Sequence, residues 1–441
     1  MRYFIKFSVS LTILVCFISC AEKKIHPYQA IVSSDIDNFF NAFDAIHQTT
    51  DSLEQLISLR TEFLDKASEG QLAMIAARNY SKQEYLDVIL AYPKFWNSIR
   101  KNTNDMTPHN EALREGVQQL RNIYPDLESG TIYYTVGAFR SPGTGLNDKI
   151  LIGSEFALGE TTTDVSEFKG VRDHTANYYK IDPKQYLSFL TVHEYVHTQQ
   201  KDIPDNLLSH TLREGIAEFV AIQATGKDSP WGAFNYGPEN ETFVRNTFES
   251  QMFNGRSYGN WLWNGTDNLF GHHDMAYYVG YKIAQLHYDA ATDKQKAIKE
   301  LIELDFMDEQ AVERLVDGSG YFSAKLDVLY ENYQKNRPKV LAIEPFENGS
   351  QQVDPSIDEV TVRFTKPLDT LYRGFDFGPL GEQNAMKLTK YLGFSEDGKS
   401  VRFQVDLKPN TQYQLQLPSK FVDSDGNAIP PYLIDFKTSG K

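Results

Sequence analysis

The stretch TVHEYVHTQQ, residues 191–200, places two histidines four positions apart, with a glutamate beside the first. Residues i and i+4 of a helix lie on one face, so His193 and His197 can offer two imidazole nitrogens to a single metal ion. Glu194 would then lie within reach of a water molecule on that ion. The spacing predicts a metal site with Glu194 as its general base, and a polar helix face that pairs with its neighbours is the alternative.

A third ligand is expected downstream, because two histidines leave zinc short of the three protein ligands usual at catalytic sites. The segment LREGIAEFVAIQA follows, and in it Glu214 starts a second helix-like segment with Glu218 one turn later. We expect Glu214 to bind the ion and Glu218 to accept a hydrogen bond from the non-ligating nitrogen of a ligand histidine. The opposite assignment of the two glutamates stays open.

Hydrolysis at such a metal site would also need a donor for the negative charge of its transition state. The segment GHHDMAYYVGYKIAQLHYD offers His272, His273, Tyr277, Tyr278 and Tyr281. Tyr278 and Tyr281 lie one helical turn apart and are the two tyrosines that we single out, although aromatic stripes on helices more often belong to the core.

Four further features have weaker signals. We expect His210 in the turn before Glu214, and His174 and His287 have no partner at metal spacing. Trp231, Trp261 and Trp263 either line a substrate cleft or cover the core. The strand around residues 133–138 could be the sheet edge that pairs with an extended peptide.

HEYVH followed by EGIAE resembles the gluzincin metallopeptidases. That resemblance implies zinc as the cofactor, His193, His197 and Glu214 as ligands, Glu194 as base and Glu218 behind a ligand. Over roughly residues 85–335 the chain is also similar to an uncharacterised family of predicted zinc-dependent proteases, which includes lipoproteins related to gliding-motility proteins of the Bacteroidota. The segments that carry this likeness are YPKFWNSIR, IYYTVGAFRSPGT, ILIGSEFAL, HEYVHTQQ, EGIAEF and AYYVGYKIA.

The motif needs a helix to present it. Asp182 followed by Pro183 is a good helix start, and Gln185 could close a capping box, so we expect a helix from 183 to about 201. Residues 21–128 have apolar residues at helical spacing and are predicted to be a helical region packed on the protease core. Two strands, 130–139 and 149–158, are predicted with an irregular Gly- and Pro-rich connection.

The chain changes character after Arg337 and Pro338. VTVRF, VRFQV and YQLQL alternate apolar and polar residues and are separated by turn formers, which indicates a β-sandwich. The region 338–441 resembles the bacterial Ig-like domains of surface and secreted proteins, which are usually spacers or docking surfaces.

The N-terminal residues are predicted to be a targeting segment. A basic start leads into the short apolar run SVSLTILVCFI and then Ser19-Cys20-Ala21, which resembles the lipobox of bacterial lipoproteins. Cleavage before Cys20 would attach lipid there and leave one cysteine, which excludes an internal disulfide and thiol chemistry. A plain secretory signal is the alternative.

Composition limits the partners. The 441 residues are 41% hydrophobic and carry a formal charge of -15, so the chain is globular and nucleic acid is not expected as a partner. The expected fold class is α+β: a signal peptide (1–20), the helical region (21–128), a mostly helical zincin-like core with a small sheet (129–337) and an all-β Ig-like sandwich (338–441).

Together these features predict a lipid-anchored zinc metallopeptidase of the bacterial cell envelope that acts on a peptide or protein. A non-catalytic assembly or surface-binding lipoprotein with a structural zinc site is the second hypothesis. Glu194 favours the enzyme, because a purely structural site has no use for a base beside open coordination.

Overall fold

The computed structural model describes residues 30–170 and 173–440. Cys20 and the predicted signal segment lie outside these ranges. The described chain is about 48% helix and 14% strand with small sheets, which agrees with the predicted mixture of α and β elements. None of its helices is both long and apolar enough to cross a membrane.

The first part of the chain is helical, as predicted. Its helices are α1 (Ser34–Ile46), α2 (Ser52–Ser58), α3 (Glu69–Arg78), α4 (Lys82–Ala91), α5 (Pro93–Arg100) and α6 (Thr107–Ile123). Ser81 and Glu84 form a capping box at the start of α4, so its first N–H groups have partners. The helical segment expected around 85–99 is two helices, because Pro93 has no N–H with which to continue α4.

Four short strands form a mixed sheet in the order β1 (Ile31–Val32), β2 (Thr131–Thr135), β4 (Lys149–Gly153) and β3 (Gly143–Leu146). β2 is parallel to both β1 and β4, whereas β3 is antiparallel to β4. The two predicted strands are therefore parallel neighbours, and the predicted irregular connection between them contains a third strand.

This order corrects one expectation. The strand around residues 133–138 was expected at the edge, but β2 lies inside the sheet with β1 and β4 on its two sides. The edge is β3, because Gly143–Leu146 turns back and pairs with β4.

The helix that carries His193, Glu194 and His197 is α9 (Leu187–Gln199), and it starts later than predicted. Pro183–Tyr186 is a turn of 3-10 helix instead. Asp182 does not act as an N-cap: its φ is 54° and its carboxylate accepts a hydrogen bond from the side chain of Gln185, so it caps no backbone N–H. The short helices α7 (Ser154–Ala157) and α8 (Asp173–Tyr178) precede this turn.

The second predicted helix is longer than expected. It is α10 (Leu207–Thr225), and the side chain of Asn206 caps it by accepting a hydrogen bond from the Ser209 N–H at 2.8 Å. Glu214 is therefore in the middle of the helix, not at its start. His210 was expected in a turn, and this was wrong, because the Asn206 cap starts the helix four residues before it.

The rest of the first unit is mostly helical, and the Gly- and Asn-rich stretch 229–270 holds three short helices joined by turns and irregular segments. Its helices are α11 (Ala233–Glu239), α12 (Glu241–Gln251), α13 (Tyr258–Trp261), α14 (Met275–Ala290), α15 (Lys294–Ile302), α16 (Glu309–Ser319) and α17 (Leu326–Asn336). One continuous hydrophobic core runs from Ile36 to Leu326, so the N-terminal helices and the motif-bearing helices share it.

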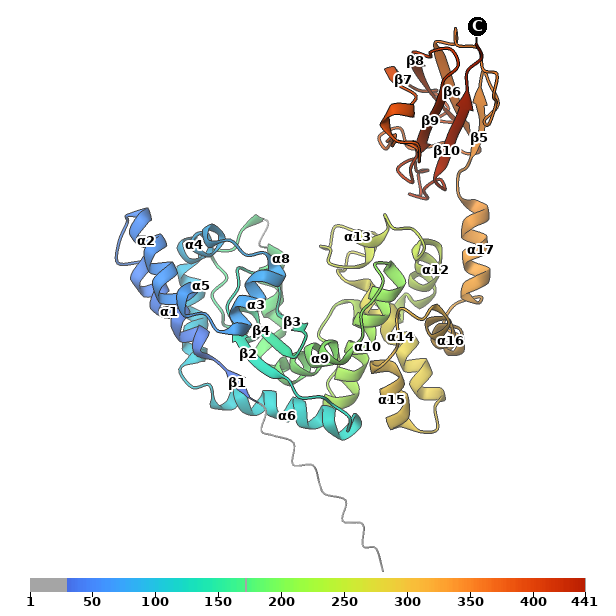
Figure 1. The fold of residues 1–441 in the computed structure, drawn as a ribbon. Coiled ribbons are helices and arrows are strands. Elements are labelled where there is room, and N and C mark those ends of the chain that lie inside the picture. The colour runs from blue at the N-terminus through green and yellow to red at the C-terminus, as the bar shows by residue number, and fades with distance from the viewer. Residues whose placement is uncertain (1–29, 171–172, 441) are drawn as a thin grey trace, which may run out of the picture.

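Layers on the sheet place α9 at the centre of this unit. α3 packs on β2 and β4, where Gly70 lies against the ring of Tyr133, while α9 packs against β3 and β4. α10 then packs on α9, and α14 on α10. Figure 1 shows this succession from the sheet through α9 to α10 and α14.

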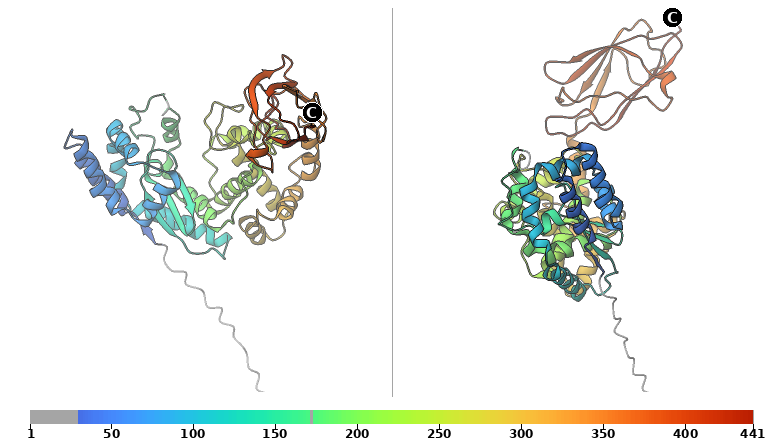
Figure 2. Two further views of the ribbon diagram at one scale, coloured as in Figure 1. Left: turned by 45° about the horizontal axis from the view of Figure 1, so that its top comes forward. Right: turned by 90° about the vertical axis from the view of Figure 1, so that its left-hand side faces the viewer.

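Residues 340–437 form a separate β unit with its own apolar core. β5 (Val340–Glu344), β6 (Glu359–Phe364), β8 (Ser400–Val405) and β7 (Leu388–Phe394) form one antiparallel sheet in that order, and β9 (Gln412–Leu417) pairs with β10 (Tyr432–Lys437). The three strands predicted from alternation are β6, β8 and β9. The β unit follows α17 and stands apart from the sheet β1–β4 (Figure 2).

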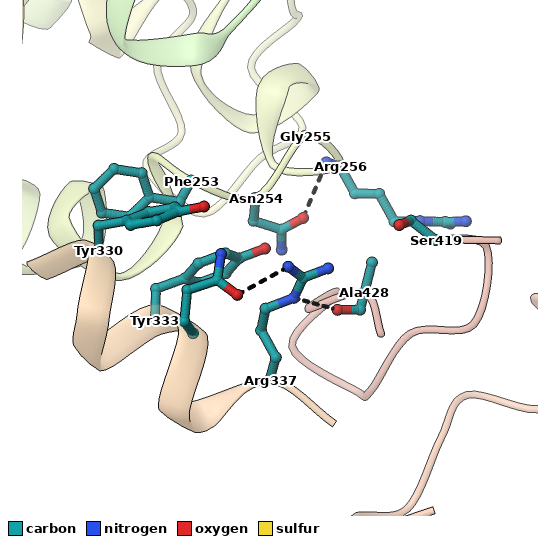
Figure 3. Close-up of a pocket in the computed structure, with 10 residues that line it drawn as sticks. Phe253, Asn254, Gly255, Arg256, Tyr330, Tyr333, Arg337, Ser419 and Ala428 are labelled. Atoms are coloured by element: carbon teal, nitrogen blue, oxygen red, sulfur yellow. Dashed lines mark hydrogen bonds between the residues drawn. The ribbon is translucent and has the colours of Figure 1, made fainter. Parts of the chain in front are cut away.

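A cavity of about 320 Å³ lies where the two units meet (Figure 3). Arg337 at the end of α17 donates from Nε to the Ala428 carbonyl at 2.7 Å, and Asn254 donates to the Asp425 carbonyl at 3.2 Å. The guanidinium of Arg256 lies 4.0 Å from the ring centroid of Tyr372. These polar contacts join the β unit to the helical unit.

Candidate metal centre

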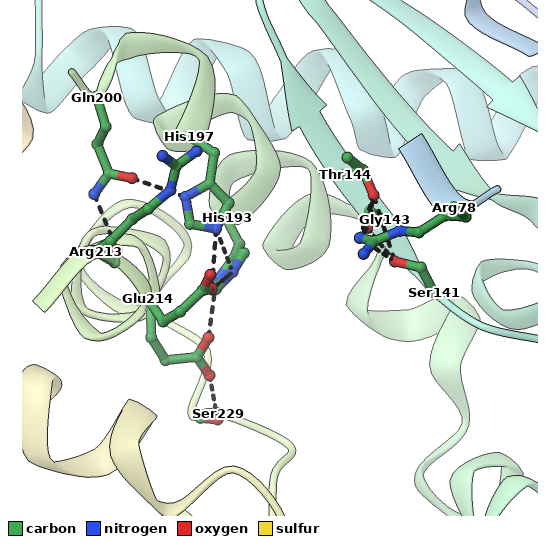
Figure 4. A network of polar contacts seen from close by, with 11 residues as sticks. Arg78, Ser141, Gly143, Thr144, His193, His197, Gln200, Arg213, Glu214 and Ser229 are labelled. Atoms are coloured by element: carbon green, nitrogen blue, oxygen red, sulfur yellow. Dashed lines mark hydrogen bonds and ion pairs between the residues drawn. The ribbon is translucent and has the colours of Figure 1, made fainter. Parts of the chain in front are cut away.

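Three buried side chains from α9 and α10 converge on one point. The Nε2 atoms of His193 and His197 lie 3.1 Å apart. Glu214 Oε2 lies 3.1 Å from His197 Nε2 and 3.5 Å from His193 Nε2. This group, visible in Figure 4, is arranged so that it could hold a metal ion, and it is the ligand set that the sequence predicted.

The outer nitrogens of both rings face acceptors. His193 Nδ1 lies 2.9 Å from Glu218 Oε2, and His197 Nδ1 lies 2.8 Å from Gln200 Oε1. Gln200 donates from Nε2 to the Arg213 carbonyl at 2.9 Å, which turns its amide oxygen toward the ring. In a neutral ring the proton is therefore on Nδ1, and Nε2 presents a lone pair.

This arrangement tests whether the residues fit a metal ion. When both rings are neutral, two imidazole lone pairs and one carboxylate point at the same centre, and they repel one another unless a proton or a cation lies among them. The donor set is therefore suited to a positive ion. Glu214 takes the inner position and Glu218 the outer one, which is the expected assignment and not the opposite one that the sequence left open.

The pKa values of His193 and Glu214 also indicate that this centre stabilises a positive charge. Burial disfavours the charged form of His193, but hydrogen bonds with Glu214 and Glu218 outweigh burial and raise its pKa to about 10. Burial acts to raise the pKa of Glu214, yet the two histidines hold this pKa well below its usual value. In the metal-free chain a proton on His193 serves as the cation.

Glu194 lies on the side of the centre that faces β3. A Cβ added to Gly143 would come 2.6 Å from Glu194 Oε1, and one added to Gly145 would come 2.7 Å from the Cβ of His197. Only glycine at these two positions lets the edge strand lie this close to α9. In the described part of the chain Glu194 forms no ion pair, so its carboxylate is available as a proton acceptor.

The N-terminal helices hold this edge strand. Arg78, the last residue of α3, donates from Nη2 to the Ser141 hydroxyl at 2.9 Å and to the Gly143 carbonyl at 3.3 Å. Figure 4 shows Arg78 with Ser141, Gly143 and Thr144 opposite the histidine cluster. The helical region before the sheet therefore positions the strand beside Glu194, a contact that the sequence analysis did not foresee.

The tyrosine at the centre is Tyr277. Its ring is stacked on His193, with centroids 6.0 Å apart and planes 6° apart. Burial and the negative charge of Glu214, with which it also shares a hydrogen bond, raise the pKa of Tyr277 well above its usual value. Its hydroxyl therefore stays protonated and can donate a hydrogen bond.

Tyr278 and Tyr281, the two tyrosines singled out from the sequence, lie elsewhere. The Tyr278 hydroxyl donates to Glu241 of α12, and the Tyr281 ring packs on Phe219 and Phe234. The physical reason is the helix crossing: Gly280 lies against Thr211 and Gly215, and this close contact turns the residue one turn earlier, Tyr277, toward Glu214.

The remaining candidates lie around the centre or away from it. His272 packs on Tyr236, and His273 contacts Asp274 and the ring of Trp231. His287 lies 3.3 Å from Glu300, and the side chain of His174 is outside the description. Trp261 is buried in the core, whereas Trp263 is exposed.

The chain matches no protein-family model and no curated protein. Among solved structures it is similar to the S-layer protein rSbsC(31-844), with 11% identity and a TM-score of 0.18 over 92% of this chain and 45% of that one. The N-terminal part of the bacterial S-layer protein SbsC gives 13% identity and a TM-score of 0.19 over 92% and 77%. The chain spans less than half of the first of these.

Proposed function

We propose that this chain is a zinc-dependent metallopeptidase of the gluzincin type. The observation that supports it is the convergence of two histidine nitrogens and one glutamate oxygen, each histidine held by an acceptor on its other nitrogen. In this proposal residues 129–337 are a zincin-like core, and the β unit is an Ig-like module.

Zinc is the proposed ion because of the number and type of donors. Catalytic zinc sites use three protein ligands, typically histidine and carboxylate, and keep a fourth position open. Bonds of about 2.0–2.1 Å in tetrahedral geometry separate ligand atoms by roughly 3.3–3.4 Å. The three separations here are 3.1, 3.1 and 3.5 Å, so only small adjustments of the side chains are needed.

The reaction proposed is hydrolysis of a peptide bond. When bound, zinc supplies a Lewis acid that lowers the pKa of a water molecule and polarises a carbonyl oxygen. Glu194 would accept a proton from the attacking water molecule and pass it to the leaving amine. The Tyr277 hydroxyl donates a hydrogen bond to the oxygen on which negative charge develops.

An extended peptide is the proposed substrate. β3 is an edge strand, and its residues Gly143 and Gly145 lie directly against α9 beside Glu194 and His197. A peptide added to this edge would run past the metal centre with its backbone held by strand pairing. The negative charge of the chain, -15, makes nucleic acid an unfavourable partner.

The proposed location is the bacterial cell envelope. Cys20 would carry the lipid that anchors the chain to a membrane, and a β unit that follows the enzyme would act as a spacer or docking module. Labelling cells with a lipid precursor tests this: the native chain should take up label, and a Cys20→Ala variant should not.

Metal analysis and peptide cleavage test the enzyme together. The soluble form without residues 1–20, its Glu194→Gln variant and a matched Glu241→Gln variant are analysed for zinc and incubated with a peptide library. We expect one zinc ion per chain in all three and cleavage by the native and Glu241→Gln proteins only.

Two results would overturn the proposal. Protein that binds no zinc would remove the metal centre, and equal cleavage by Glu194→Gln would remove the base. Zinc in every variant with cleavage by none would favour the second hypothesis, a non-catalytic assembly or surface-binding lipoprotein with structural zinc.

A further inference from the structure

Trp263 is exposed in a way that folding alone does not explain. Its side chain is 61% exposed, and its φ of 51° is a left-handed conformation that costs energy for a bulky residue. Two positions earlier, Trp261 is fully buried and donates from Nε1 to Gln251 at 2.8 Å. Trp261 therefore covers the core, and Trp263 contributes little to it.

The strained backbone is held in place by hydrogen bonds. The Trp263 N–H donates to Asp274 Oδ1 at 2.6 Å, and the Asp274 N–H donates to Asn264 Oδ1 at 2.9 Å. Asp274 directly precedes α14, the helix that carries Tyr277. The connection 262–274 thus fixes an exposed indole relative to the helix beside the metal centre.

Trp263 is one of three aromatic rings that contact one another. His210 lies 5.2 Å from Trp263 and 5.3 Å from Tyr258 between ring centroids, and Tyr258 lies 5.5 Å from Trp263. The His210 ring meets the other two edge to face. We call these three residues the aromatic platform. Rings in such arrangements attract a further aromatic group beyond the effect of buried area alone.

The aromatic platform adjoins the metal centre. His210 is one helical turn before Glu214 on α10, so the two side chains lie on one face of the helix. His210 also contacts the ring of Tyr258, so the aromatic platform begins one helical turn from Glu214. The Tyr258 hydroxyl is buried, so Tyr258 contributes its ring to the aromatic platform.

We propose that His210, Tyr258 and Trp263 form a substrate subsite that binds an aromatic side chain close to the scissile bond. This rests on the proposed peptidase function and adds a substrate class to it. The exposed indole of Trp263 supplies the contact surface for this aromatic side chain.

Binding can be measured without hydrolysis. Zinc-loaded Glu194→Gln protein is titrated into fluorescently labelled alanine-rich peptides, each with a single phenylalanine at a different position, and into an all-alanine peptide. We expect the best phenylalanine peptide to bind about tenfold tighter than the all-alanine peptide, because one well-placed aromatic contact has about this effect.

Two variants test whether the preference for phenylalanine comes from Trp263. Trp263→Ala in the same background should reduce the preference for phenylalanine to about twofold or less. Leu269→Ala is the matched control: it lies on the same connection and is 58% exposed, and it should leave the preference unchanged. Zinc content and thermal unfolding of each variant show that it is folded.

The outcomes separate this inference from the proposed function. If Trp263→Ala keeps the full phenylalanine preference, or if no phenylalanine position binds tighter than alanine, the subsite is wrong, whatever the enzyme cleaves. If the preference depends on Trp263 but the native protein cleaves no peptide, the subsite stands as a binding site and the peptidase proposal fails.

Discussion

The buried polar groups of the β unit and those of the metal centre have different kinds of partners. In the β unit, Asp423 accepts hydrogen bonds from the backbone N–H groups of Asp425 and Asn427, and the Thr438 hydroxyl donates to the Lys408 carbonyl. In the metal centre, His193, His197 and Glu214 direct lone pairs at one another. These polar groups of the β unit have partners within that unit, whereas the metal centre is suited to an added cation.

Removal of the ion should give the largest contrast. Chelation should abolish peptide cleavage and destabilise only the helical unit, by about 4 kcal/mol where zinc had been present at a thousandfold its dissociation constant. Calorimetry should show that the transition of the helical unit falls by roughly 10 °C while that of the β unit stays in place. Added zinc should restore both the transition and the activity. If chelation lowers the unfolding temperatures of both units equally, the metal centre does not stabilise the helical unit alone.

The next contrast compares two tyrosine hydroxyls. Tyr277→Phe should lower kcat about a hundredfold with zinc retained, because a donor to the transition state is lost. Tyr413→Phe in the β unit is the control. It removes the acceptor of the Lys408 N–H, so it should cost about 1 kcal/mol in unfolding of the β unit and leave kcat unchanged. Equal kcat for native and Tyr277→Phe proteins would show that Tyr277 has no such role.

Two buried carboxylates provide a third contrast. Glu218 is fully buried behind His193, so Glu218→Gln should weaken zinc binding roughly 10- to 100-fold. Asp423→Asn makes the same chemical change in the β unit, where it should cost about 1 kcal/mol of stability. Competition with a chromogenic chelator measures zinc affinity. If Asp423→Asn weakens zinc binding as much as Glu218→Gln does, Glu218 has no special role in holding the ligand His193.

The smallest expected effect is the number of protons that the chain releases when it binds zinc. His193, with its pKa raised to about 10, holds a proton in the metal-free chain at pH 8 and must lose it to bind an ion. Zinc binding should release about one proton at pH 8 and fewer as pH rises through 10. The β unit cannot contribute, because residues 338–441 contain no histidine. Titration calorimetry in buffers of different ionisation enthalpy measures the release, and buffer-independent heat at pH 8 would contradict it.

The metal-free helical unit should also respond to pH. A folded-state pKa above the ordinary histidine value adds stability that is fully present below about pH 6.5 and is lost as pH rises through 10. The unfolding transition of the zinc-free helical unit should therefore fall over that range. The same scan with zinc bound is the control, since the ion then replaces the proton.

The sequence was most informative where neighbours in the chain determine the structure. Apolar residues at helical spacing predicted the N-terminal helices such as α1, and period-two alternation predicted β6, β8 and β9. The sequence was least informative about where helices begin and about how helices and strands pack across one another. Asp182 has the sequence pattern of an N-cap but takes a left-handed conformation. Gly143–Leu146 has the glycine content of a loop, yet it is a strand whose glycines allow α9 to pack closely against it.

What the sequence alone determined is the pairing of His193 with His197 and the position of Glu194 beside them, because the periodicity of one helix brings residues i and i+4 together. Only the tertiary structure decided that Glu214 faces inward and Glu218 outward, that Tyr277 and not Tyr278 or Tyr281 lies at the centre, and that β3 is the edge strand. These depend on how α9, α10 and α14 cross, and the close contact of Gly215 with Gly280 that sets the second crossing joins residues 65 positions apart.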